Sequence, residues 1–115
     1  MKVGIVGLPQ VGKTTIFKLL TRGRVDTSSW GGGREAHIGI AEVADPRLDR
    51  LAAIVKPKKT TYATIEYVDL PGLARGEGKA ALEGRSKEMA SYLASLKNVE
   101  ALLHVVRAFE DPSLP

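Results

Sequence analysis

Two kinds of hydrophobic pattern alternate along the chain. Short continuous runs rich in Val, Ile and Ala are typical of strands buried in a parallel sheet. They occupy Lys2 to Gly7, His37 to Val43, Ala63 to Val68 and Ala101 to Val106. Helical spacing of apolar residues lies between these runs, in Lys13 to Leu20, after Asp45-Pro46, and at Met89, Leu93 and Leu96. The alternation predicts an α/β fold with a mostly parallel sheet.

The second of these predicted helices carries its own start and stop signals. Asp45 suits the N-cap position, and Pro46 follows it at the first helical position. Three apolar residues are spaced for one helical face: Leu48, Leu51 and Ile54. The run from Lys56 to Lys59, with its proline, ends the helix. This run could meet RNA phosphates, although a charged turn is more commonly only solvated.

Polar, glycine-rich sequence separates the first predicted helix from the second predicted strand. The stretch from Gly23 to Arg34 includes three consecutive glycines and predicts a long loop rather than packed structure. A second loop rich in glycine and charge follows Pro71. Long loops in compact domains are often functional. Both loops are therefore candidates for segments that respond to a ligand.

Composition excludes several classes of protein. The chain has 115 residues, 43% of them hydrophobic, which predicts one soluble domain. It contains no cysteine, so disulfide scaffolds and thiolate chemistry are excluded. No apolar run approaches the roughly 18 to 20 residues of a membrane span, and we expect a cytoplasmic protein without membrane contact. The formal charge of +4 is compatible with a polyanionic partner such as ribosomal RNA, but does not require one.

The segment from Gly7 to Thr14 matches G-x-x-x-x-G-K-[ST] at every fixed position. Glycines let the backbone wrap a phosphate, and the following helix N-terminus favours negative charge. Lys13 is expected to reach the β- and γ-phosphates, with Thr14 on Mg²⁺ and Thr15 at the α-phosphate. The predicted nucleotide-binding residues are Pro9, Gln10, Val11, Gly12, Lys13, Thr14 and Thr15. The motif lies between a predicted strand and a predicted helix, as its mechanism requires.

A D-x-x-G tetrad, Asp69 to Gly72, follows the third predicted strand. A carboxylate at this place can hold Mg²⁺ through water, and the Gly72 amide can touch the γ-phosphate. The tetrad carries little information alone but gains it beside the phosphate loop. We therefore predict Thr14 and Asp69 as metal residues and Lys13 and Gly72 as catalytic residues.

Two further residues have two interpretations each, and a third has one. His37 could be a catalytic or phosphate-sensing imidazole, but a histidine at a loop edge is more commonly only solvated. Trp30 could stack on a base, although an exposed loop anchor is the simpler interpretation. His104 lies inside a predicted strand, and we expect it to pack in the core.

Four segments together resemble the YchF family of Obg-like ATPases, within the translation-factor-related P-loop GTPases. They are Gly7 to Thr15; Gly39 to Val43 with Asp45 to Asp49; Lys56 to Lys59 with Thr64 to Asp69; and His104 to Arg107 with Phe109 to Pro112. The DPRLD and VVR-x-FEDP strings in them are more discriminating than the phosphate loop. The resemblance implies a three-layer P-loop fold, hydrolysis of ATP or GTP, often with a preference for ATP, and also Mg²⁺ and ribosome association.

The chain departs from this family pattern in its first switch. Gly33 stands where members carry a magnesium-binding threonine, and Ala36-His37 replaces Pro-Asn. The hydroxyls of Thr27, Ser28 and Ser29 lie some residues away, so it stays open whether this loop ligates Mg²⁺. Leu73 follows Gly72 where Ras-like enzymes carry a water-orienting glutamine. The family implies a hydrophobic residue there, and with it slow hydrolysis or a water positioned by another group.

The leading interpretation is a Mg²⁺-dependent nucleoside triphosphatase that signals to the ribosome through ordering of its two loops. One alternative is a nucleotide-gated binding module with negligible hydrolysis. A small-molecule kinase is disfavoured by the D-x-x-G tetrad. We expect residues 1–115 to be the N-terminal part of a nucleotide-binding domain, with the motif that selects ATP or GTP beyond Pro115. The sequence does not determine the oligomeric state.

Overall fold

The computed structural model describes residues 1–25, 36–71 and 89–114. The elements follow in the order β1 (Lys2–Val6), α1 (Lys13–Leu20), β2 (His37–Glu42), α2 (Pro46–Val55), β3 (Thr64–Asp69) and β4 (Ala101–His104). Residues 89–96 form a further helix before β4. Each predicted strand and helix is present, with strand ends that differ from the predicted ones by one or two residues.

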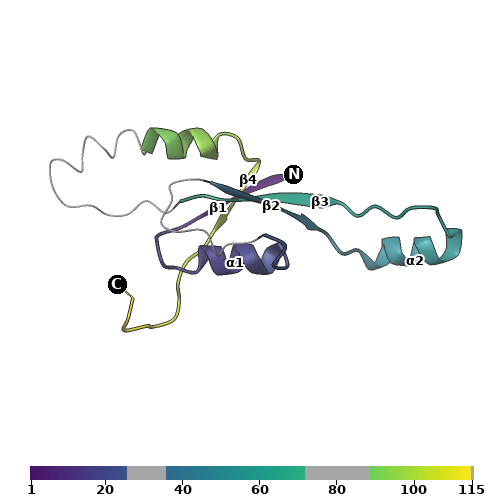
Figure 1. Ribbon diagram of the computed structural model, residues 1–115, viewed down its shortest axis with the longest axis horizontal. Coiled ribbons are helices and arrows are strands. Elements are labelled where there is room, and N and C mark those ends of the chain that lie inside the picture. Colours follow the sequence, from purple (N-terminus) through teal and green to yellow (C-terminus); the bar gives the residue numbers. More distant parts are fainter. Residues whose placement is uncertain (26–35, 72–88, 115) are drawn as a thin grey trace.

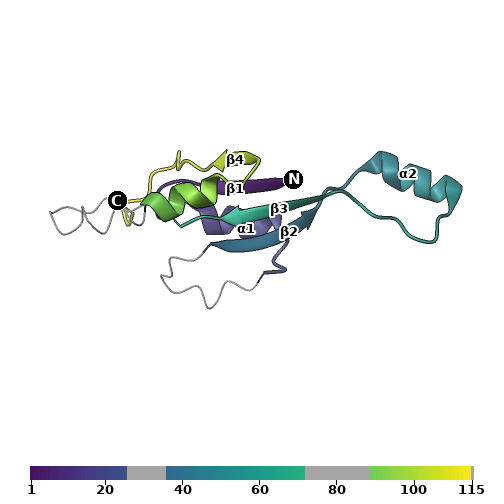
Figure 2. The same ribbon diagram turned by 90° about the horizontal axis from the view of Figure 1, so that it is seen from above.

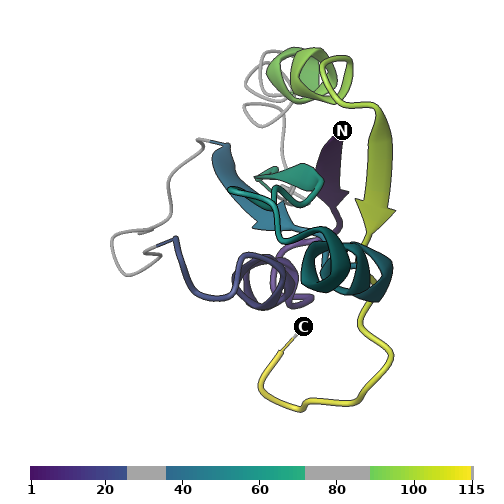
Figure 3. The same ribbon diagram turned by 90° about the vertical axis from the view of Figure 1, so that its right-hand side faces the viewer.

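The four strands form one sheet in the order β2-β3-β1-β4. β1 runs parallel to both β3 and β4, whereas β2 pairs antiparallel with β3. α1 lies on one face of the sheet, and helix 89–96 lies on the other (Figures 1 and 3). The expected three-layer α/β fold with a mostly parallel sheet is therefore confirmed.

The described core lies between α1 and the sheet. Ile5 on β1 and Phe17 on α1 are fully buried, and Val105 after β4 packs with them. Gly39 on β2 allows α1 to approach closely, because a Cβ there would lie 2.5 Å from Thr21 Cγ2 and 2.9 Å from Phe17 Cζ. The Thr21 hydroxyl is buried and donates to the Phe17 carbonyl at 2.8 Å. The end of α1 is thereby fixed against β2.

α2 projects from the sheet at the far end of the β2–β3 hairpin (Figures 1 and 2). It forms where the sequence predicts, because Asp45 caps it and Pro46 begins it. However, the predicted apolar face is not covered: none of the ten residues of α2 is buried in the structure. Leu51 is 57% exposed and Ile54 is 78% exposed. The helix is thus held by its own ends rather than by packing.

The prediction that His104 packs in the core is wrong. β4 is an outer strand of the described sheet and pairs only with β1 there, so its side chains are poorly covered. His104 is exposed, as are its neighbours Leu102 and Leu103. No helix in the described ranges has the length and apolar character needed to cross a membrane.

Candidate phosphate-binding site

The phosphate loop connects β1 directly to α1. Gln10 and Gly12 adopt left-handed backbone conformations, with φ of 64° and 100°. Gly12 is the N-cap of α1, and its carbonyl accepts from the Ile16 amide at 3.0 Å. At the start of the loop, a Cβ on Gly7 would lie 2.6 Å from the Val105 carbonyl oxygen. The local backbone geometry favours glycine at Gly7 and Gly12, which explains the two fixed glycines of the motif.

Lys13, the first residue of α1, turns its side chain back over the loop. Its Nζ donates to the Leu8 carbonyl oxygen at 3.2 Å, and only 9% of the residue is exposed. Burial lowers the pKa of Lys13, while the charge of Asp69 acts in the opposite direction. A buried ammonium with one neutral acceptor is poorly compensated, so this position favours an additional anion.

Asp69, the last residue of β3, faces the start of α1. The Thr14 hydroxyl donates to Asp69 Oδ2 at 3.3 Å, while the buried Oδ1 has no hydrogen-bond partner among the residues that the structure describes. Burial raises the pKa of Asp69, and the charges of Lys13 and His37 and the Thr14 hydrogen bond lower it. β3 ends beside the loop because it runs parallel to β1, with Asp69 opposite Ile5.

These oxygen donors fit a hard divalent cation such as Mg²⁺. The unpartnered Oδ1 of Asp69 and the hydroxyl of Thr14 are the ligand types that Mg²⁺ prefers. Among the described residues, no group of three or more His, Cys, Asp or Glu residues could hold a metal by itself.

His37 lies closer to this site than the sequence alone indicated. It is the first residue of β2, half-buried, and directly opposite Asp69 in the β2–β3 ladder. Its charge is one of the influences that lower the pKa of Asp69. The sequence predicted a strand beginning here, but only the strand register shows which residue His37 faces.

Some of the remaining predicted residues lie within the described ranges, and others lie outside them. Pro9 and Gln10 are exposed in the loop, Val11 is half-buried against the core, and Thr15 is exposed on α1. Lys13, Thr14 and Asp69 come together as the motifs predict. The described ranges do not include Gly72, Leu73, Trp30 or the first-switch positions 27–33.

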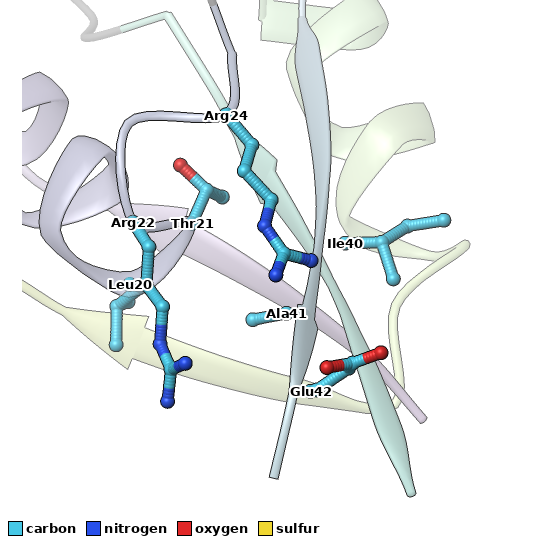
Figure 4. Close-up of a pocket in the computed structure, with 7 residues that line it drawn as sticks. All are labelled: Leu20, Thr21, Arg22, Arg24, Ile40, Ala41 and Glu42. Carbon is cyan, nitrogen blue, oxygen red and sulfur yellow. The ribbon is translucent and has the colours of Figure 1, made fainter. Parts of the chain in front are cut away.

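A second concave feature lies away from this loop, where the end of α1 meets β2. It has room for about one water molecule. Figure 4 shows the residues that line it: Leu20, Thr21, Arg22, Arg24, Ile40, Ala41 and Glu42. Its size excludes a nucleotide.

Comparison with known proteins identifies relatives of similar sequence. A family model described as 50S ribosome-binding GTPase matches residues 2–114. The chain is 41% identical over 114 residues to Ribosome-binding ATPase YchF of Escherichia coli O157:H7, covering 98% of the chain and 30% of that protein. It is 39% identical over 115 residues to the protein of the same name from Mycoplasma pneumoniae, covering 99% and 30%. The chain thus spans less than a third of the length of these relatives.

The matched region contains the whole described site. It also contains the four segments that resemble the YchF family, and the identity to YchF proteins confirms that resemblance. The chain therefore belongs to the 50S ribosome-binding GTPase family and, within it, to the YchF group.

Proposed function

We propose that this chain binds a nucleoside triphosphate with Mg²⁺ and contributes to its hydrolysis. One observation carries the proposal: buried Lys13 and the Thr14–Asp69 pair lie together at the end of the phosphate loop, which contains residues in the left-handed backbone conformation. Each part is incomplete alone. A triphosphate would supply the anion that Lys13 lacks, and a cation would use the free Oδ1 of Asp69.

The residues then divide the work by position. The Lys13 ammonium neutralises charge on the β- and γ-phosphates. The backbone amides of Gln10, Val11 and Gly12 donate to phosphate oxygens, whereas Pro9 has no amide hydrogen and only shapes the loop. Thr15 donates at the α-phosphate. Thr14 and Asp69 would hold Mg²⁺, and the ion would supply neutralisation of charge on the phosphate oxygens. Gly72, two residues after Leu70, would donate its amide to the γ-phosphate.

We further propose that this region is the N-terminal part of a nucleotide-binding domain and that it acts with the ribosome in the cytoplasm. The support comes from the family description and from relatives named ribosome-binding ATPases. The family description refers to a GTPase and the names of the relatives to an ATPase, so the proposal includes both nucleotides. Hydrolysis would be signalled through the loops at 23–37 and 73–79.

Single-turnover hydrolysis of ATP and GTP, with and without ribosomes, tests this proposal. We expect slow hydrolysis that requires Mg²⁺ and is changed by ribosomes. Binding without hydrolysis under both conditions would favour the alternative, a nucleotide-gated binding module. Absence of nucleotide binding would contradict both.

Leu73 provides a second test of the hydrolytic mechanism. A leucine cannot orient water, so Leu73→Ala is expected to keep the single-turnover rate within about tenfold, or about 1.4 kcal/mol of barrier. Leu73→Gln is expected to give little or no gain. A hundredfold loss in the alanine variant would show that this side chain acts in catalysis after all.

A further inference from the structure

The α2 end of the molecule has features that the nucleotide site does not use. α2 joins the end of β2 to the start of β3, whereas the phosphate loop follows the end of β1, which is parallel to β3. The two features therefore lie at opposite ends of the sheet, as Figure 2 also shows. Phosphate binding gives no reason for a projecting helix at this end.

The projecting segment holds most of the net positive charge of the chain. Residues 45–60 contain five cations and two carboxylates, a net charge of +3, whereas the whole chain has +4. Arg47 is paired with Asp45, with Nη2 and Oδ2 2.9 Å apart. The other four cations are Arg50, Lys56, Lys58 and Lys59; all are exposed, and no ion pair joins them to other described residues.

The segment is also preorganised for contact. The Asp45 side chain accepts from the Arg47 amide at 3.0 Å, and the Lys56 amide donates to the Ala52 carbonyl at 2.9 Å, so both helix ends are fixed. The Tyr62 hydroxyl donates to Asp49 and ties the returning chain to the helix. Arg47, Arg50 and Ile54 recur at helical spacing and share one side of α2. A rigid exposed helix loses little entropy when it docks.

We propose that α2 and the Lys56 to Lys59 turn form a docking surface for the phosphate backbone of folded RNA. Charge complementarity selects this partner, because four uncompensated cations at a projecting tip match closely spaced phosphates. A protein partner for exposed Leu51 and Ile54 would leave the lysine turn without a role. The identification of this RNA as ribosomal rests on the proposed ribosome association; the RNA contact itself does not.

Two double variants with equal charge change test the surface. Lys58→Gln/Lys59→Gln removes two cations from the turn, and Lys18→Gln/Lys97→Gln removes two exposed cations elsewhere. Binding of a fluorescein-labelled RNA hairpin is measured by anisotropy over a range of salt concentrations. For the turn variant we expect about tenfold weaker binding and a log–log salt slope smaller by about 1.4 to 1.8, since two phosphate contacts are lost. The control variant is expected to stay close to wild type.

Three outcomes would overturn the inference. The first is unchanged hairpin affinity in the turn variant, and the second is equal weakening of hairpin binding in the turn and control variants. The third is loss of large-subunit binding in Leu51→Ser/Ile54→Ser while the turn variant still binds hairpin and subunits normally. The last would indicate a protein partner.

Titration with a fluorescent nucleotide and co-sedimentation with large ribosomal subunits distinguish failure of the α2 surface from failure of the proposed function. Normal nucleotide and subunit binding beside unaffected hairpin binding would refute only the α2 surface. Lysine-dependent hairpin binding without subunit binding would refute only the ribosomal role.

Discussion

α1 and α2 are helices of similar length, but they are stabilised in opposite ways. α1 has Gly12 as its N-cap and therefore no side-chain cap, and Phe17 in its middle is fully buried. α2 has a side-chain cap at Asp45, yet none of its residues is buried. Tertiary packing holds the first helix, and local hydrogen bonds hold the second.

This difference determines how far the effect of a substitution spreads. Lys13, Thr14 and Asp69 depend on one another at the packed end, so changing one alters the environment of the others. No side chain of α2 is buried. Substitutions in α2 should therefore change local order or partner binding and leave the nucleotide site intact.

The largest expected effect is at the packed end, in Lys13→Ala. The substitution removes the buried ammonium aimed at the β- and γ-phosphates, and we expect nucleotide affinity to fall by at least about a hundredfold. Titration with a fluorescent triphosphate measures it. Lys18→Ala, on an exposed position of the same helix, is the control and should bind normally. Unchanged affinity in a folded Lys13→Ala protein would refute the phosphate-loop assignment.

Gly39→Ala should have the next largest effect, on stability. The new Cβ would lie 2.5 Å from Thr21 Cγ2 and 2.9 Å from Phe17 Cζ, an overpacked contact that we expect to cost about 1 to 3 kcal/mol. Urea unfolding measures the free energy. Thr21→Ser removes the clashing methyl and keeps the hydroxyl that donates to Phe17. The double variant should recover part of the loss, and strict additivity of the two costs would contradict the close contact.

The sequence predicted most of the packed end because its determinants are local. The fixed spacing from Gly7 to Thr14 and the strand before Asp69 were sufficient to bring the motif residues together. Contacts between distant segments that carry no motif were not predictable in this way. The approach of Thr21 to Gly39 and the placement of His37 opposite Asp69 depend on strand register, which no local pattern encodes.

The exposed regions were predicted less well for a different reason. Helical spacing of Leu48, Leu51 and Ile54 indicates an apolar face but not what covers it, and α2 leaves Leu51 and Ile54 exposed. An apolar run around His104 indicates a strand but not whether that strand is central or outer. Burial is a property of the assembled sheet, so periodicity alone could not supply it.

The smallest expected effect, and the sharpest test of the contrast between the helices, is in Asp45→Ala. Asp45 accepts from the Arg47 amide at 3.0 Å and from the Arg47 guanidinium, and α2 has no buried side chain to compensate for their loss. Removal of such a cap costs about 1 kcal/mol, equivalent to roughly fivefold faster amide exchange within 46–55. Hydrogen exchange measures this directly.

Asp111→Ala is the matched control, because it removes a half-buried aspartate bound to its own turn through Ser113 and changes the charge equally. It should leave exchange in α2 unchanged. Nucleotide affinity should be the same in both variants, since the cap lies at the opposite end of the sheet from Lys13. If Asp45→Ala instead accelerated exchange throughout α1 and weakened nucleotide binding, α2 would be coupled to the core, and the separation between a packed end and a locally held end would fail.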